Sequence, residues 1–361
     1  MSNLLRILRQ RIAHQGPLTV ADYMAEALGH LEHGYYMKND PFGAGGDFTT
    51  APEISQMFGE LIGIWCAVSW QQMDAPEKFN LVEIGPGRGT LMADILRAGG
   101  NLPGFINAMD LYLVETSPVL QGLQEKTLAD APVQSSWKQY FTEIPEGPLI
   151  LVANELFDAL PVRQFESTAN GWVERLINFD DADTLVWRQG SENPASASFI
   201  PGPLKDEPAG SLYEMSSAGL SLMASIGNAI ASHGGTALII DYGHSETTCG
   251  DTLQAVKNHQ FYDFLADPGD ADLTAHVDFQ ALKETAEQAG AAAFGPVTQG
   301  DYLRRLGIEP RAQQLESVAT SRQKEDVREA LERLTSADEM GTLFKVLAVA
   351  HPDQPRPEGF T

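Results

Sequence analysis

The stretch Leu81-Val-Glu-Ile-Gly-Pro-Gly-Arg-Gly-Thr90 is the most informative part of this sequence. It follows a short apolar run and precedes a segment with the apolar spacing of a helix, so it predicts a strand, a tight turn and a helix. Gly85, Gly87 and Gly89 let the backbone turn sharply and approach a ligand closely, where a side chain would clash. The free N–H groups at the start of the helix favour a negative group. The segment therefore predicts a ligand-binding strand–helix turn.

Three details separate this turn from that of dinucleotide enzymes. Glu83 precedes the first glycine by two residues, where its carboxylate can face an ammonium group. Thr90 stands where the dinucleotide pattern Gly-x-Gly-x-x-Gly has its third glycine. Glu115 ends the next apolar run and can accept hydrogen bonds from both ribose hydroxyls. S-adenosylmethionine has an ammonium group and a ribose but no pyrophosphate. The carboxylate of Glu83 suits the ammonium group and would repel a pyrophosphate. We therefore expect this cofactor; the alternative is a Rossmann domain for another nucleotide, such as a nicotinamide dehydrogenase.

The pattern around this turn predicts an α/β fold. From Phe79 onward, short apolar runs alternate with helical segments, which is typical of a parallel, doubly wound, Rossmann-like sheet. The expected strands are Phe79–Ile84, Leu111–Glu115, Leu149–Ala153, Ala237–Asp241 and Leu343–Ala350, with Val297–Gln299 beside the last. A β-ribbon is expected where Val173–Phe179 and Thr184–Arg188 flank an Asp-rich turn.

These patterns predict three regions. Residues 1–76 form an N-terminal helical region that contains a glycine-rich loop, with one helix from Thr19 through Ala27 and another over Glu53–Trp70. Residues 77–351 form the core, interrupted by a β-ribbon and helical insertion at about 163–230. Residues 352–361, with three prolines, are expected to be a frayed, flexible tail.

Composition limits the partners. The chain has 24 Lys and Arg against 49 Asp and Glu, a net charge of −25, which disfavours nucleic acid. An acidic chain would suit a cationic partner such as an arginine-bearing protein, but charge alone is explained better by solubility. Its two cysteines cannot form a disulfide framework, and no metal-binding motif surrounds them. No apolar run reaches the roughly 18 residues of a membrane-spanning helix, so no membrane insertion is expected.

The N-terminal segment has some features of a transit peptide, because Met1–Val20 is basic and lacks acids. Its apolar residues nevertheless have the spacing of an ordinary amphipathic helix, which favours a cytoplasmic protein. These residues are Leu4, Leu5, Ile7, Leu8 and Ile12.

A second group of polar residues follows the strand at 149–153. Asn154, Glu155 and Asp158 lie beyond its carboxyl end, where open α/β sheets bind ligands. If a helix begins at Asn154, the two carboxylates share one face. The other interpretation is structural: Asn caps the helix, and the acids favour its dipole. The spacing alone supports both equally.

Four segments together resemble the MidA family, whose mitochondrial members are the complex I assembly factor 7 proteins, protein arginine N-methyltransferases. The segments are Gly34–Met37, Gly46–Gly59, Glu83–Thr90 and Asn154–Pro161, and the resemblance extends from about Arg6 to His351. It implies a seven-stranded methyltransferase sheet, S-adenosylmethionine as the methyl donor, and symmetric dimethylation of an arginine on a respiratory complex I subunit.

The resemblance also implies roles for individual residues. Asp47–Thr50, which by itself would be a plain surface connection, is expected to fold over the cofactor. Asp241–Gly243 is placed near the rim of the site, and Leu273–Phe279 brings His276 toward it. The expected cofactor-binding residues are Asp47, Thr49, Thr50, Glu83, Gly85, Pro86, Gly87, Gly89, Glu115, Thr116, Ser117 and Asn154, and the expected catalytic residues are Glu155, Asp158 and His276.

Arginine is a demanding nucleophile, because its pKa exceeds 12 and its charge is delocalised. A carboxylate pair can grip the guanidinium and concentrate charge away from the attacking nitrogen. Glu155 and Asp158 are the best candidates for this pair, with Glu214 a distant third. The alternatives are a small-molecule methyltransferase on the same fold and a complex I assembly chaperone without turnover.

Overall fold

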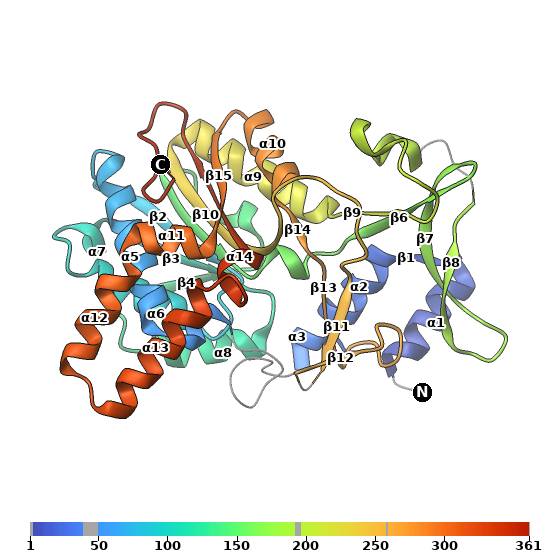
Figure 1. Cartoon of the computed structure of the whole chain (residues 1–361), viewed down its shortest axis with the longest axis horizontal. Helices are drawn as coiled ribbons and strands as arrows, with labels where there is room; N and C mark the ends of the chain where they lie inside the picture. The colour runs from blue at the N-terminus through green and yellow to red at the C-terminus, as the bar shows by residue number, and fades with distance from the viewer. Residues whose placement is uncertain (1–2, 39–49, 192–195, 258, 361) are drawn as a thin grey trace.

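The computed structural model describes residues 3–38, 50–191, 196–257 and 259–360 (Figure 1). At its centre is a sheet with the strand order β4-β3-β2-β5-β10-β16-β15. This path has the seven strands that the family resemblance implies, and β14 adds an eighth by pairing with β10. The bounds are β2 (Phe79–Ile84), β3 (Met109–Val114), β4 (Ser135–Lys138), β5 (Leu149–Asn154), β10 (Gly235–His244), β14 (Val277–Asp278), β15 (Ala292–Thr298) and β16 (Phe344–Ala350).

Strand direction identifies the topology. Strands β4, β3, β2, β5 and β10 run parallel, and β16 runs antiparallel to both of its neighbours. The chain leaves β2 toward β3 on one side and later returns to β5 on the other, so the strand order reverses at β2. Ligands bind at such a switch point in open α/β sheets. The α/β prediction is confirmed, and β4 is the strand that sequence reasoning missed, because its Ser-Ser-Trp-Lys sequence lacks an apolar run.

Each strand of the sheet feeds two separate cores, because successive side chains point to opposite faces. Leu81, Ile150 and Val152 pack on one face with helices α5 and α6, whereas Val82 and Leu151 pack on the other with α9 and α10. The helices are α1 (Asn3–Gln15), α2 (Val20–Gly29), α3 (Tyr35–Lys38), α4 (Ala51–Ile54), α5 (Gln56–Gln72), α6 (Thr90–Gly99), α7 (Phe105–Ala108), α8 (Pro118–Thr127), α9 (Ser217–His233), α10 (Phe279–Gln288), α11 (Gln299–Leu306), α12 (Ile308–Val318), α13 (Ser321–Thr335) and α14 (Met340–Leu343).

A smaller lobe lies beside the sheet, on the right of Figure 1. It has a third core, shared by α1, α2 and strands that come from two distant parts of the chain. One sheet has the order β1-β7-β6-β9 with β8 paired to β7, and the other has the order β12-β11-β13. The bounds are β1 (Leu18–Thr19), β6 (Arg163–Thr168), β7 (Gly171–Phe179), β8 (Leu185–Gln189), β9 (Leu212–Met215), β11 (Gln254–Lys257), β12 (Gln260–Tyr262) and β13 (Asp272–Thr274).

The packing of this lobe does not follow the three predicted regions of the chain. The predicted N-terminal region packs in two places, since α1 and α2 belong to the lobe while α5 covers the central sheet. The insertion predicted for 163–230 contributes β6 to β9, but its helical end, α9, packs on the central sheet. The β-ribbon itself forms as predicted, with β7 and β8 antiparallel.

Two local expectations differ from the structure. The helix expected over Glu53–Trp70 is broken at Ser55, which has extended backbone angles and whose Oγ accepts a hydrogen bond from Met57 N at 3.2 Å, so that α5 begins at Gln56. The C-terminal segment is packed rather than frayed, because the Phe360 ring is only 5% exposed and lies against Tyr302. In the described part of the chain, no helix has both the length and the apolar character needed to span a membrane.

Candidate functional site

The glycine-rich turn connects β2 to α6 at the switch point of the sheet. Gly85, Gly87 and Gly89 have φ angles of 69°, 54° and 82°, all in the left-handed region that glycine adopts most readily. A Cβ on Gly85 would lie 2.9 Å from the Leu156 side chain. The turn therefore requires glycine for both its backbone and its packing.

Glu83 lies on β2 just before this turn and is 3% exposed. Its Oε2 atom has no hydrogen-bond partner among the described residues, and burial raises the pKa of the carboxyl to about 8. It borders a recess of about 40 Å³ whose walls include Thr50, Pro86, Arg88 and Asn154. A buried carboxyl with an unused oxygen is suited to receive a cationic group from a ligand.

Glu115 follows β3 and is held by two donors. Its Oε1 atom accepts a hydrogen bond from Ser117 N at 2.8 Å, and its Oε2 atom accepts one from Gln124 Nε2 at 3.1 Å. Gln124 Nε2 also donates to Gly87 O at 2.8 Å, so this amide ties the carboxylate to the glycine turn. Sequence reasoning missed Gln124. Its complete burial would have singled out this polar side chain, but burial is visible only in the structure.

Ser117 joins the core to the N-terminal region. Its Oγ atom donates to Tyr36 O at 2.7 Å and accepts from Leu120 N at the start of α8. The Tyr36 hydroxyl in turn donates to Asp272 Oδ1 at 2.8 Å, which connects α3 to β13. The segment at 35–38 is thereby anchored from two sides.

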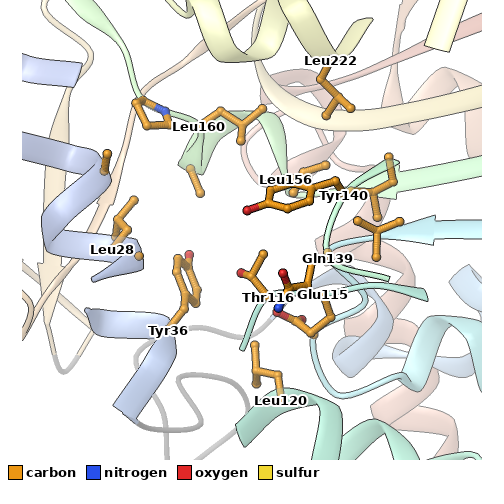
Figure 2. Close-up of a pocket in the computed structure, with 18 of the residues that line it drawn as sticks. Leu28, Tyr36, Glu115, Thr116, Leu120, Gln139, Tyr140, Leu156, Leu160 and Leu222 are labelled. Atoms are coloured by element: carbon orange, nitrogen blue, oxygen red, sulfur yellow. The ribbon is translucent and has the colours of Figure 1, made fainter. Parts of the chain in front are cut away.

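A cavity of about 410 Å³ lies between these elements (Figure 2). Tyr36 and Tyr140 project into it from opposite walls, and Glu115 and Thr116 lie at its lower edge in this view. Most of its walls are apolar, and Glu155 brings a carboxyl to them. The other lining residues include Met24, Leu28, Ile84, Gly85, Gly87, Val114, Leu120, Gln139, Phe141, Leu156, Leu160, Pro161 and Leu222.

The turn after β5 brings Asn154, Glu155 and Asp158 together, but not on a helix. Glu155 has a φ of 50°, and the next regular element is a 3-10 turn at Phe157–Ala159, so the helix expected from Asn154 is wrong. The physical reason is Asp241, whose Oδ2 atom accepts from the backbone N–H groups of residues 156, 157 and 158 at 3.1, 2.9 and 3.2 Å. These three N–H groups donate to the Asp241 side chain instead of to the backbone carbonyls of a helix.

The two carboxyl groups of this turn have different partners. Glu155 Oε1 accepts from Ala51 N and from Asn154 Nδ2, both at 3.1 Å. Asp158 Oδ2 accepts from the Tyr242 hydroxyl at 2.5 Å, whereas Asp158 Oδ1 and Asn154 Oδ1 are buried without a hydrogen-bond partner among the described residues. Burial raises the pKa of Glu155 to about 7, with the charge of Asp158 adding to the rise, and burial raises the pKa of Asp158 as well.

His276 and Glu214 lie apart from this cavity. The His276 ring packs edge-on against Tyr242, with centroids 5.7 Å apart, and borders a separate recess of about 30 Å³ together with Glu214. Glu214 accepts hydrogen bonds from Gln164 and from the backbone of Thr252 and Leu253, so its oxygens are used within the protein. Of the residues expected to cover the cofactor, Thr50 lies at the recess beside Glu83, and Asp47 and Thr49 fall outside the described residues.

Comparison with known proteins identifies the family. Residues 61–297 match the family described as "Putative S-adenosyl-L-methionine-dependent methyltransferase". The protein arginine methyltransferase NDUFAF7 of Danio rerio is 38% identical over 96% of this chain and 86% of its own, and the human protein of that name is 36% identical over 96% and 83%. A crystal structure of a Burkholderia thailandensis protein of the COG1565 superfamily, bound to S-adenosyl-homocysteine, superposes with a TM-score of 0.87 at 28% identity, covering 99% of this chain and 94% of that one. The chain therefore belongs to this family of S-adenosylmethionine-dependent methyltransferases, as its glycine turn and its MidA-like motifs predict.

Proposed function

We propose that this chain transfers the methyl group of S-adenosylmethionine to an arginine side chain of a protein. The observation that carries the proposal is Asp158 Oδ1, a buried oxygen without a hydrogen-bond partner among the described residues, on the same turn as Glu155, which lines an apolar cavity. A guanidinium group has the five N–H donors and the charge that such a pair requires. The names of the NDUFAF7 relatives support the same chemistry.

The residues around the glycine turn fit the cofactor. Glu83 Oε2 would accept from its ammonium group, Glu115 would accept from its ribose hydroxyls, and the backbone at 85–89 allows close approach. S-adenosylmethionine supplies a methyl group on a sulfonium, which is already an activated leaving group. The protein therefore has to position the nucleophile and adjust its charge.

The shape of the cavity suits the remainder of an arginine side chain. Its walls, with Leu28, Leu160 and Leu222, can cover the three methylene groups, and Tyr36 presents an aromatic ring near the path of the cation. The guanidinium would then contact Glu155, which lines the cavity, and reach toward Asp158 on the same turn. As the attacking nitrogen would bond to the methyl carbon, the carbon–sulfur bond would break and release the thioether. The nitrogen would lose a proton, and Glu155, which lines the cavity, would accept it.

The finer assignments rest on the family resemblance. It favours a respiratory complex I subunit as the protein substrate. The curated relatives are named as mitochondrial, and a cytoplasmic location is a proposal from the amphipathic spacing of the first helix. A net charge of −25 is compatible with a basic segment as the substrate.

The test adds the purified protein and tritiated S-adenosylmethionine to an extract of cells that lack this protein, and measures methyl transfer. The extract is split into protein and small-molecule fractions, and labelled protein is hydrolysed for amino-acid analysis. Label recovered as methylarginine is the expected result. Label confined to small molecules would replace the proposal by a small-molecule methyltransferase, and mass spectrometry of complex I subunits with and without the protein tests the finer assignment.

A further inference from the structure

The end of β10 carries two adjacent residues that contact the turn after β5. We propose that Asp241 and Tyr242 are positioning residues for methyl transfer: Asp241 shapes the turn at 155–158, and Tyr242 orients Asp158 so that one of its oxygens faces the substrate. This inference rests on the proposed function, because it assigns Glu155 and Asp158 to the binding of a guanidinium. The assignment of Glu83 and the glycine turn to the cofactor does not depend on it.

Asp241 acts on the backbone. It is fully buried, and its two oxygens accept from four N–H groups: three in the turn after β5 and one, at 2.8 Å, from Tyr242 N. A carboxylate that gathers three successive N–H groups imposes a tight curve on that segment. The left-handed φ of 50° at Glu155 is unusual for a residue with a side chain, and it lies immediately before the three gathered groups. The hydrogen bonds to Asp241 therefore stabilise the unusual backbone conformation of Glu155, which lines the cavity.

Tyr242 acts on a side chain. Its hydroxyl donates to Asp158 Oδ2, and its ring is held between His276 and Phe344, with centroid distances of 5.7 and 5.4 Å. These two contacts hold the ring in the position from which its hydroxyl reaches Asp158. Because Asp158 Oδ2 is already bonded, the buried Oδ1 is left to accept from a ligand. This also accounts for His276, which supports Tyr242 rather than reaching the cavity.

The charged and titratable groups that face Asp158 come from three elements. They are Glu155 on the same turn, Asp241 and Tyr242 at the end of β10, and Tyr36 on α3. Burial opposes the ionised form of Asp158, whereas the Tyr242 hydrogen bond favours it. Removing the hydroxyl should consequently raise the pKa at which Asp158 ionises.

The deciding variant is Tyr242→Phe, which keeps the ring and removes the hydroxyl. Methyl transfer into the extract described above should fall about tenfold, as expected for the loss of one hydrogen bond to a charged group. The acid limb of the pH–rate profile should move to higher pH, while calorimetry with S-adenosylmethionine should give an unchanged affinity. A merely structural role would lower the rate at all pH values equally.

Tyr302→Phe is the matched control, since Tyr302 is fully buried and its hydroxyl has no partner among the described residues. It should leave the rate and the pH profile as in the unmodified protein. If Tyr242→Phe behaves like this control, the inference is overturned. If the unmodified protein labels no arginine at all, the proposed function fails instead, so the two failures are distinguishable.

Asp241→Asn tests the other half of the inference, because an amide would direct a donor at the turn. Hydrogen exchange at the amides of residues 156–158 should become faster, with a loss of transfer larger than that of Tyr242→Phe. Unchanged exchange at these three amides would reject the role of Asp241. If this variant does not fold, the result for Tyr242→Phe decides the inference alone.

Discussion

The two turns that border the cavity are built in opposite ways. The turn at 85–89 owes its shape to three glycines within five residues, all with positive φ. The turn at 155–158 contains no glycine and is shaped by Asp241, which lies 83 to 85 residues further along the chain. A turn of the first kind can be recognised locally, whereas a turn of the second kind exists only when two neighbouring strands have paired. The assigned roles differ in the same way: the first turn would hold the cofactor and the second would hold the substrate.

The largest effect is expected from a substitution in the glycine turn at 85–89. Gly87→Val places a branched side chain at a φ of 54°, which β-branched residues almost never adopt, and next to the expected ligand. Affinity for S-adenosylmethionine, measured by calorimetry, should fall by at least about 100-fold, or about 2.8 kcal/mol. Gly210→Val is the control, because Gly210 also has a positive φ, of 94°, with open space around it and no part in the cavity. Retained affinity in Gly87→Val would remove this turn from the cofactor site.

The next variant separates the second turn from the first. Glu155→Gln keeps the oxygen that accepts from Ala51 N and Asn154 but removes the negative charge. Methyl transfer should fall by about 100-fold or more, because charge stabilisation at the reacting group is lost, while cofactor affinity stays within about threefold. Glu214→Gln, at a half-buried carboxyl outside the cavity, should retain most of the activity. Equal rates for both variants would show that Glu155 has no special role.

A smaller effect sharpens the assignment of Glu83. Its carboxyl, with a pKa raised to about 8, holds a proton at pH 7, and a bound ammonium group should lower that pKa. Cofactor binding at pH 7 should therefore release up to about one proton, measured by calorimetry in buffers of different ionisation enthalpy. Glu83→Gln should abolish this release and weaken binding about tenfold. Proton release that persists in Glu83→Gln would have to come from another group.

The smallest effect concerns the stability of the cofactor-free protein. Raised pKa values at Glu83 and Glu155, about 8 and about 7, mean that the folded chain binds more protons than the unfolded chain above about pH 4.5. These two groups thus contribute stability at low pH that is lost as pH rises through 7 and 8. Against the same scan for Glu83→Gln, the melting temperature of the unmodified protein should fall further between pH 5 and 8.5, by on the order of 2–4 °C. Parallel curves would argue against the raised pKa of Glu83.

Much of the central sheet could be predicted because its strands are continuous apolar runs. The pattern at Phe79–Ile84 and Leu149–Asn154 places both strands within about one residue of their bounds. Strand β4 at Ser135–Lys138 has no such pattern, because it lies at the edge of the sheet. Burial of Phe360 was equally invisible, since three prolines in the last ten residues are typical of a loose tail and only the folded core offers the ring a partner.

The turn after β5 was only half predictable. Its acids could be placed at the carboxyl end of a strand, which is a property of the chain order. Their partners could not, because Tyr242, Ala51 and Asp241 meet them through packing between distant segments. For His276 the motif indicated a position near the cavity, but the ring packs against Tyr242 and does not line the cavity.

By itself, the sequence determined the α/β fold, the glycine turn and the two carboxylates that flank it, since hydrophobic period and backbone sterics act over a few residues. Only the tertiary structure decided how Glu155 and Asp158 are presented. Their geometry depends on hydrogen bonds from residues tens of positions away, and such bonds have no local pattern because they form only when the sheet has brought β5 and β10 together.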